Sequence, residues 1–239
     1  MNILITICAR GGSKGIPGKN IKIINGSPLI EYTIKLAKLF IVKWNAKISL
    51  STDSIEILNI AEKLGVKTEY IRPNFLSTDS AGKIDTIKDL LIYEESLLKN
   101  KFDYILDLDV TSPLRNLLDL EKSFELLKSS SAINLFSVNN ASRNPYFNMV
   151  EENEGGFYSL VKTSKDGSVL TRQTAPRVFE LNASFYWYKR IFFDLEHKSA
   201  ITNNSLIYEM PHYCFDLDHP IDFLFMEYLL EHNKLDFEL

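Results

Sequence analysis

The chain has 239 residues, 45% of them apolar and 24% charged, which is typical of one large globular domain. No apolar run approaches the roughly 18 residues of a membrane span, and the start lacks the features of a secretory signal, so we expect a cytoplasmic protein with no membrane partner. The net charge of −4 gives no sign of a nucleic-acid surface, so an anionic ligand must meet a local cluster of positive charge.

The first third of the chain predicts alternating strands and helices. Ile3–Ala9 is a short buried strand, and residues 10–26 are a glycine-rich loop. A helix is expected to begin at Ser27-Pro28, with Ser27 as its cap. Three further strands are then expected, KISLSTD ending at Asp53, VKTEYI and FDYILDLDV, together with helices over 54–64, 82–99 and 117–128.

This rhythm predicts an α/β fold with a mostly parallel sheet and helices on both faces, a Rossmann-like arrangement. Ligands of such sheets bind at the carboxyl ends of the strands. The stretches RGGSKG, STD and TSPLR all follow strands and are expected at that edge.

After about residue 131 the pattern becomes β-rich. AINLFSV, YFNMVEENEGGFYSLV, SVLTRQ and ASFYWYK predict strands and hairpins, with turns at Glu154-Gly155-Gly156 and Asp166-Gly167. Residues 1–239 are interpreted as one domain in which about 139–189 form an inserted β-rich arm, a reasonable place for dimerisation. A helix from about Pro220 to His232 closes the chain.

The loop after the first strand is the leading candidate for a phosphate site. Gly11 and Gly12 allow close approach of backbone amides to an anion, and Arg10, Lys14 and Lys19 add positive charge. The spacing is neither a Walker A loop nor G-x-G-x-x-G, which argues against a dinucleotide dehydrogenase. A solvated basic turn is the alternative, but the position directly after a buried strand favours phosphate binding.

Two acidic residues near the end of the chain are the leading metal candidates. Asp216 and Asp218 are two apart, so an extended backbone points both carboxylates to one side, which suits Mg²⁺. Alternatively, Asp218 caps the helix that begins near Pro220. Asp107 and Asp109 have the same spacing and either share the metal, orient a sugar hydroxyl or merely close a strand.

Two other polar stretches are weaker candidates. Thr111, Ser112 and Arg115 of TSPLR form a polar clamp or simply a turn and helix start. Arg172 of TRQ is either a carboxylate partner or a surface ion pair, and the residues do not decide between these. Cys8 and Cys214 lie in apolar runs and are expected to be buried thiols, and the four histidines lack metal-ligand spacing.

Taken together and in order, these stretches resemble the acylneuraminate cytidylyltransferases, the CMP-sialic acid synthetases and their bacterial relatives. The similarity rests on six segments: ARGGSKGIPGKN (9–20), STD (51–53), IRPNFLSTDSA (71–81), TSPLR (111–115), RQTAP (172–176) and FDLD (215–218). It implies a sugar-nucleotidyltransferase fold, a homodimer, and Mg²⁺-dependent transfer of CMP from CTP to the anomeric hydroxyl of a nonulosonic acid, with release of pyrophosphate.

The resemblance also implies roles for individual residues. The nucleotide would be held by the loop and by two residues beyond it, namely Ala9, Arg10, Gly11, Gly12, Ser13, Lys14, Lys19, Arg72 and Ser80. Arg172 and Gln173 lie in the stretch that faces the sugar acid in the family, and Tyr186 lies near it. The further candidates for sugar binding are Asp109, Thr111, Ser112 and Arg115. Asp216 and Asp218 would bind the metal, and Arg10, Lys19 and this acidic pair would carry the catalysis.

The chain departs from the family pattern at two places. Asp109-Val110 stand where the sialic acid enzymes have Gln-Pro, and Leu181-Asn182-Ala183 stand where they have Pro-Asn-Gly. Both are expected near the sugar, which makes legionaminic, pseudaminic or another modified nonulosonic acid as good a candidate as N-acetylneuraminic acid. Activation of 3-deoxy-manno-octulosonate or a sugar 1-phosphate, and a non-catalytic nucleotide-binding role, are the alternatives.

Overall fold

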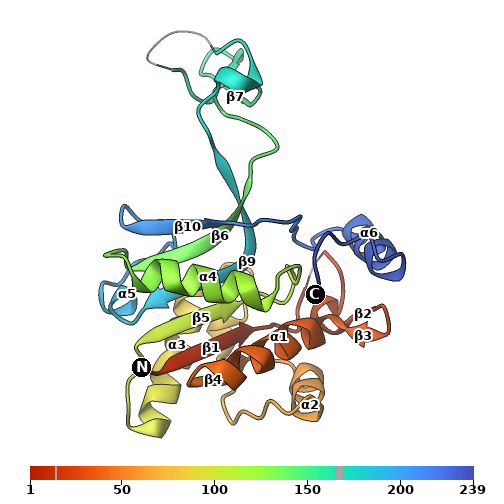
Figure 1. Cartoon of the computed structure of the whole chain (residues 1–239), viewed down its shortest axis with the longest axis vertical. Helices are drawn as coiled ribbons and strands as arrows, with labels where there is room; N and C mark the ends of the chain where they lie inside the picture. Colours follow the sequence, from red (N-terminus) through yellow and green to blue (C-terminus); the bar gives the residue numbers. More distant parts are fainter. Residues whose placement is uncertain (14, 165–168) are drawn as a thin grey trace.

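The computed structural model describes residues 1–13, 15–164 and 169–239. Its main body is a six-stranded sheet in the order β10-β6-β9-β5-β1-β4, covered by helices on both faces (Figure 1). The strands are β1 (Ile3–Cys8), β4 (Ala46–Ser51), β5 (Tyr104–Leu108), β6 (Asn134–Asn140), β9 (Phe179–Lys189) and β10 (Ser205–Glu209). Only β9 among them runs antiparallel to its neighbours, so the expected mostly parallel α/β sheet is confirmed.

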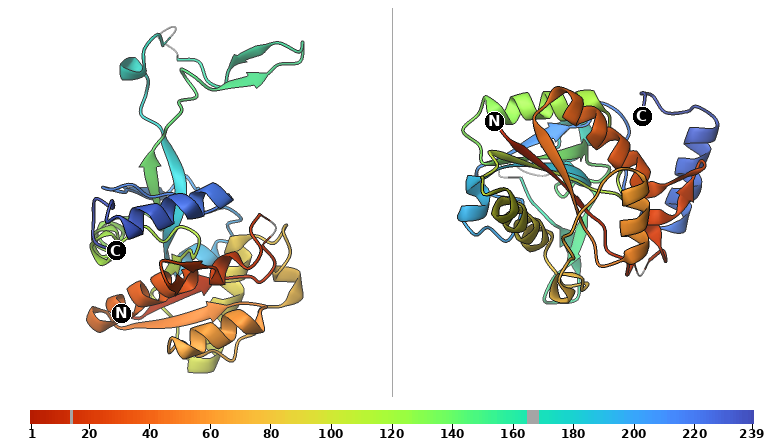
Figure 2. Two further views of the ribbon diagram at one scale, coloured as in Figure 1. Left: turned by 90° about the vertical axis from the view of Figure 1, so that its right-hand side faces the viewer. Right: turned by 90° about the horizontal axis from the view of Figure 1, so that it is seen from below.

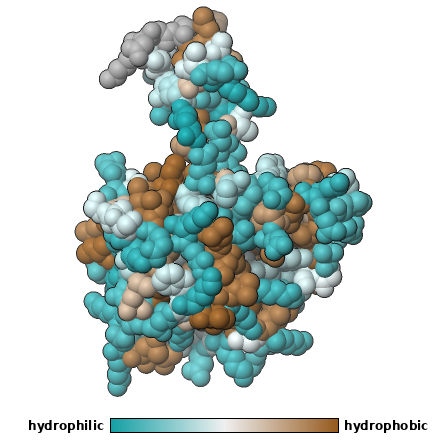
Figure 3. Space-filling view, viewed as in Figure 1, coloured by the Kyte–Doolittle hydropathy of each residue, from teal (hydrophilic) through white to brown (hydrophobic). Residues whose placement is uncertain are grey.

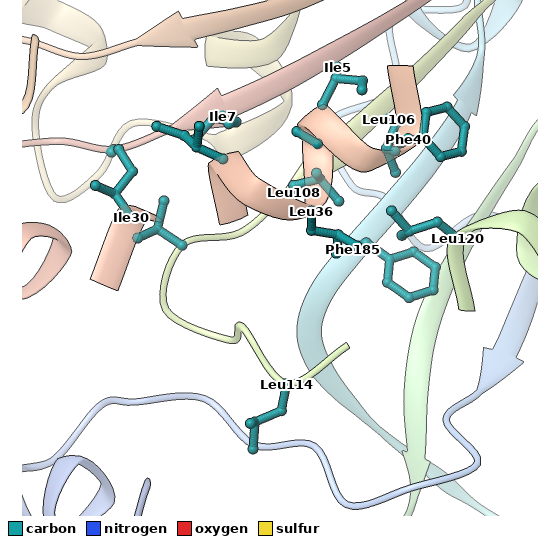
Figure 4. Packing of buried hydrophobic residues seen from close by; sticks show 14 of the residues in the cluster. Ile5, Ile7, Ile30, Leu36, Phe40, Leu106, Leu108, Leu114, Leu120 and Phe185 are labelled. Atoms are coloured by element: carbon teal, nitrogen blue, oxygen red, sulfur yellow. The ribbon is translucent and has the colours of Figure 1, made fainter. Parts of the chain in front are cut away.

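Alternation along β1 divides the core into two layers. Ile3, Ile5 and Ile7 point to the face covered by α1 (Leu29–Lys43), α2 (Ile55–Lys63) and α4 (Leu117–Lys128). Figure 4 shows this packing, with β-strand side chains against residues of α1. Leu4 points to the opposite face, where α3 (Lys83–Leu98) and α5 (Ile191–Asp194) pack. Thr6 and Cys8 share that second face, which matters for the site.

The start of the first helix differs from the expectation. Asn25 and Gly26 both have positive φ, 46° and 78°, and form the tight turn of a hairpin between β2 (Ile23–Ile24) and β3 (Ser27–Pro28). Ser27 therefore lies in strand β3 of the hairpin and does not cap the helix. The helix begins at Leu29, and its N-cap is Pro28, which makes no side-chain cap bond.

VKTEYI is not a strand, so β4 remains the edge of the sheet. Its alternating burial instead reflects packing against the helices. Tyr70 is buried, and its hydroxyl donates to Asp89 of α3 at 2.6 Å. SVLTRQ is not a strand either over its described residues, because Arg172–Thr174 form a 3-10 helix.

An arm projects far from the body (Figures 1 and 2). It lies between β6 and β9 and contains a hairpin of β7 (Val150–Glu152) and β8 (Tyr158–Leu160), which turns at the predicted Glu154–Gly156 position. The predicted Asp166-Gly167 turn lies outside the described residues. The expected boundary of 139–189 is too wide, because most of β9 pairs with β5 and β6 in the central sheet, and the projecting part covers about 141–178.

The final helix, α6 (Pro220–Glu231), begins where the proline predicted it. No helix in the described part of the chain has the length and apolar character needed to cross a bilayer. Hydrophilic residues cover much of the visible face of the body, with apolar patches between them (Figure 3).

Candidate active site

The loops after β1, β4 and β5 meet at the carboxyl edge of the sheet, as expected for parallel strands. The backbone N–H of Gly11 donates to Asp53 Oδ1 at 2.8 Å and joins the first two loops. A Cβ at Gly11 would lie 2.9 Å from the Cβ of Ser54, so only glycine fits this crossing. A Cβ at Gly12 would meet nothing within 4 Å, which leaves the backbone open to a ligand.

A cavity of about 280 Å³ lies beside these loops. Its lining combines cations, hydroxyls, carboxylates and a few small apolar groups: Cys8, Arg10, Ser13, Lys19, Asn20, Arg72, Leu76, Thr78, Asp79, Ala81, Lys83, Thr86, Asp109 and Thr111. A larger hollow of about 500 Å³ at the β4 edge contains none of the predicted site residues.

The cavity cations have different partners. Arg10 pairs with Asp79 at 2.7 Å, and Lys19 pairs with Asp218 at 3.0 Å. Arg72 is buried and donates to the side chain and carbonyl of Ser51 at 2.9 and 2.7 Å. Its guanidinium is thus fixed in the cavity wall.

Other residues predicted for the nucleotide are placed less directly. Ser13 lines the cavity, whereas Ala9 is fully buried and its backbone N–H donates to Ser51 O at 2.9 Å. Ser80 is exposed, lies within hydrogen-bond distance of Thr78, and is not among the cavity-lining residues in the described part of the chain. Lys14 lies outside the described residues.

The acidic pair reaches the same edge through contacts with the TSPLR loop. Leu217 N donates to Thr111 O at 2.8 Å, which holds the FDLD segment against that loop. Asp218 does not cap α6: the N-cap is His219, and Asp222 accepts from the backbone N–H groups of Asp218 and His219 at 2.9 and 2.6 Å. The Asp218 carboxylate is free of the helix and contacts Lys19.

Asp216 has the chemistry of a cation ligand. Its Oδ1 is buried and has no hydrogen-bond partner among the described residues. Burial raises the pKa of its carboxyl, and the nearby carboxylates of Asp109 and Asp218 raise it further, against the opposing effects of Thr111 and Lys19. A hard cation beside Asp216 would relieve this, because it satisfies the oxygen and favours the charged form.

Lys83, which the sequence reading missed, lies at the centre of the charged groups at the end of β5. Its Nζ is 2.9 Å from Asp107 Oδ2, 2.5 Å from Asp109 Oδ2, and 5.1 Å from the ring centre of Tyr186. Burial opposes ionisation of Asp109, but Lys83 and hydrogen bonds from Thr111 outweigh it and lower the pKa to about 2. One feature of the sequence pointed to Lys83: a lysine at the first position of a helix interacts unfavourably with the helix dipole.

The TSPLR segment supports the fold more than it faces the cavity. Arg115 is 1% exposed. Its guanidinium donates to three carbonyls and two hydroxyls: Ser112 O, Ser184 O, Asp109 O, Ser184 Oγ and Thr33 Oγ1. Ser112 is also fully buried and donates to Phe215 O. Of the two alternatives for TSPLR, the contacts of Arg115 and Ser112 agree with the turn and helix start, because both hold the loop in place, and Thr111 is the member that lines the cavity.

The residues predicted for the sugar are divided between body and arm. Asp109 and Tyr186 lie at the site, beside Lys83. Arg172 and Gln173 are exposed on the arm, where Arg172 donates to Ser142 O at 3.2 Å. Asn182 is buried and accepts from Ser137 at 2.6 Å, at the irregularity where β6 and β9 shift register.

Comparison with known proteins decides the family. A family model described as cytidylyltransferase matches residues 4–231. The chain belongs to the cytidylyltransferase family. As a member of it, this chain is a nucleotidyltransferase, and the catalytic class expected from the sequence is confirmed.

Individual relatives agree with this family over nearly the full length. The chain is 40% identical to post-translational flagellin modification protein B of Campylobacter coli, with 98% of this chain and 97% of that protein aligned. It is 39% identical to the CMP-N,N'-diacetyllegionaminic acid synthase of Campylobacter jejuni, with the same coverage. A solved CMP:2-keto-3-deoxy-manno-octonic acid synthetase complexed with CTP shares the fold, with a TM-score of 0.71, 17% identity, and 98% and 100% of the two chains covered.

Proposed function

We propose that this cytidylyltransferase transfers CMP from CTP to the anomeric hydroxyl of a nonulosonic acid and releases pyrophosphate. The observation that carries the proposal is the contact between Lys19 and Asp218, which joins the glycine-rich loop to the acidic pair beside one cavity. The similarity to a legionaminic acid synthase supports this substrate class. CTP as the nucleotide donor is consistent with a reaction in the cytoplasm.

In this proposal the glycine-rich loop holds the triphosphate. Backbone amides around Gly12 and the side chains of Arg10, Ser13 and Lys19 face the anion, with Lys14 expected to join them. Positive charge at this position stabilises the negative charge that develops as the α-phosphorus is attacked. The anomeric hydroxyl gives its proton to the carboxylate of Asp216 or Asp218, its oxygen forms the new bond to that phosphorus, and the bond to the pyrophosphate oxygen breaks.

Asp216 and Asp218 are proposed to hold Mg²⁺. The unpartnered buried oxygen of Asp216 and the solvent-facing carboxylate of Asp218 are donors of the kind that this ion accepts, together with water and phosphate oxygens. When bound, the ion supplies charge neutralisation for the phosphates. In its absence Lys19 is the counter-ion of Asp218.

We further propose that the arm joins two copies of the chain in a homodimer. It exposes large apolar side chains, with Phe157 75%, Tyr158 67% and Leu170 80% exposed, as expected of a surface that another chain covers. A dimer would also give Arg172 and Gln173, which stand away from the cavity of their own chain, a sugar acid to bind in the partner's site. Analytical ultracentrifugation of the Phe157→Ser, Tyr158→Ser double variant tests this, and it should yield monomers.

A pyrophosphate-release panel tests the reaction. CTP, UTP, GTP and ATP are each combined with N-acetylneuraminic, legionaminic and pseudaminic acids, 3-deoxy-manno-octulosonate and a sugar 1-phosphate. Release is expected with CTP and one of the nonulosonic acids. Turnover only with 3-deoxy-manno-octulosonate, to whose synthetase the fold is similar, would replace the sugar assignment, and no turnover with any pair would contradict the proposal.

A further inference from the structure

Lys83 occupies a position that helix formation does not explain. It is the first residue of α3, where a cation is unfavourable for the helix dipole, yet its ammonium reaches the end of β5. There it bridges Asp107, which is fully buried, and Asp109, whose side chain is 20% exposed. Two carboxylates on different residues thus fix the direction of one ammonium group.

The charge balance defines what this ammonium can bind. One positive charge between two carboxylates leaves a net negative cluster, so a phosphate or carboxylate beside it would be repelled. An ammonium has three N–H donors. Asp109 Oδ2 accepts one of them, whereas Asp107 Oδ2 lies at ion-pair distance and has no hydrogen-bond partner among the described residues. Because Lys83 lines the cavity with a side chain that is 34% exposed, a further donor suits a neutral acceptor.

The surrounding wall identifies which part of the substrate supplies that acceptor. Cys8, Leu76 and Ala81 give the cavity small or apolar surfaces that suit a flat ring. Of the residues predicted for the sugar acid, Asp109 and Thr111 line this cavity, whereas Arg172 and Gln173 are not among its described lining residues. The small and apolar part of the wall is the part that matches the nucleoside.

We propose that Lys83 is a specificity-determining residue that donates a hydrogen bond to a neutral oxygen or nitrogen acceptor on the nucleoside of CTP. Asp107 and Asp109 anchor the donor and keep its direction fixed. This inference rests on the proposed use of CTP and adds a residue that recognises it. A fixed donor favours a base or ribose with an acceptor at that point and rejects one without it, because the Lys83 ammonium, once the nucleoside covers it, would stay unpaired.

The test separates contact with the nucleotide from charge balance in the fold. Lys83→Met removes the donor but strands Asp107, whereas Lys83→Met combined with Asp107→Asn removes one charge of each sign. Calorimetric titration with CTP, in the absence of a sugar acid, should give Kd values roughly 10- to 100-fold weaker for both variants, the range for a hydrogen bond from a charged donor. Lys88→Met, on the same helix and paired only with Glu196 at 3.9 Å among the ion pairs described, is the matched control and should bind CTP like the wild type.

The outcomes are distinct. If the double variant binds CTP as tightly as the wild type, Lys83 only balances the Asp107 charge and the inference is wrong, while the proposed function stands. A raised KM for the sugar acid with unchanged CTP affinity would also overturn it, since Lys83 would then serve the sugar. A wild-type protein that binds no CTP would remove the proposed function and this inference with it.

Discussion

Lys19 Nζ lies 3.0 Å from Asp218 Oδ1, although the two residues are 199 positions apart in the chain. The contact closes the site, because it joins the loop after the first strand to the segment before the last helix. Lys19 is largely buried, with 14% of its side chain exposed, and Asp218 is 62% exposed. The lysine is therefore held in place and the carboxylate is accessible from solvent.

Replacement of Lys19 should weaken the use of CTP. Lys19→Met removes a cation from the cavity, and we expect KM for CTP to rise about tenfold or more, the effect of one lost charge-assisted hydrogen bond. Steady-state pyrophosphate release measures this. Lys35→Met, which removes an exposed lysine paired with Glu31 on α1, is the control. Unchanged KM and kcat for Lys19→Met would exclude the triphosphate role.

Asp216→Asn should reduce kcat at least about 100-fold, because the substitution removes a charge that the proposed cation requires. The side chain keeps its shape, so the fold should be retained. Mg²⁺ titrations of activity measure the loss, with Asp236→Asn in the exposed C-terminal tail as the control. Near-normal turnover at saturating Mg²⁺ would show that Asp216 is not a metal ligand.

Arg115 should prove important for stability. Its guanidinium donates to the three carbonyls of Asp109, Ser112 and Ser184, so Arg115→Met leaves several buried acceptors unpaired, and we expect a loss of about 3 kcal/mol or more in unfolding free energy. Urea denaturation measures it, with the exposed Arg143→Met as a control. If Arg115→Met folds with wild-type stability but loses affinity for the sugar acid, the clamp expected from the sequence was right after all.

A substitution at Ala183 should raise stability, because this residue adopts a left-handed backbone conformation with φ of 57°. This conformation costs a residue with a Cβ about 1–2 kcal/mol, and glycine is free of that cost. Allowing for the greater entropy of glycine in the unfolded chain, Ala183→Gly should stabilise the protein by about 0.5–1 kcal/mol. Urea denaturation checks the sign, and Ala46→Gly in β4, outside the positive-φ set, should destabilise.

His212 should make stability depend on pH. Burial lowers the pKa of its imidazole, but the hydrogen bond to Asp119 at 2.8 Å outweighs it, and the net pKa is raised above 6.5. The ring also stacks on Phe237, and Asp236 is a further nearby charge. Since the folded pKa is the higher one, this stabilisation is complete below about pH 6.5 and is lost as pH rises through the folded value.

Unfolding free energies measured between pH 5.5 and 8.5, a range of roughly three pH units around the ordinary histidine value, check this sign. The wild type should lose stability toward the alkaline end, and His212→Asn should flatten that part of the curve. His232→Asn, on the exposed end of α6, is the control. A wild-type curve that rises with pH, or an unaltered slope in His212→Asn, would contradict the role of the Asp119 contact.

Much of this architecture follows from local patterns in the sequence. The helix over 117–128 was predicted to the residue, because Asn116 and Asp119 form a capping box and the apolar spacing is regular. VKTEYI was misread because alternating burial arises whenever an extended segment packs on a helix, whether or not it pairs with a strand. Ser27 was misread because the Asn25-Gly26 turn took precedence over a capping signal.

The position of the candidate site on the sheet was easier to predict than the contacts of its residues. The rule that ligands bind at the carboxyl ends of parallel strands predicted one edge of the sheet, and the glycine-rich loop and the acidic pair both lie at that edge. Local patterns gave no indication that Arg115 is buried, because its partners Thr33 and Ser184 are far away in the chain. Lys83 was missed because Asp107 and Asp109, the carboxylates it contacts, lie more than 20 residues further along the chain, at the end of β5, and only its unfavourable place at a helix start pointed to it.

The arm leaves and re-enters the sheet at one point, because Asn140 at the end of β6 is directly paired with Phe179 at the start of β9. A short turn across this pair would preserve every strand of the body. The excursion is thus an interchangeable module, and natural selection can lengthen, shorten or replace it without disturbing the catalytic framework. Under the proposed roles of the arm in dimer formation and sugar binding, swapping arms between relatives would alter both.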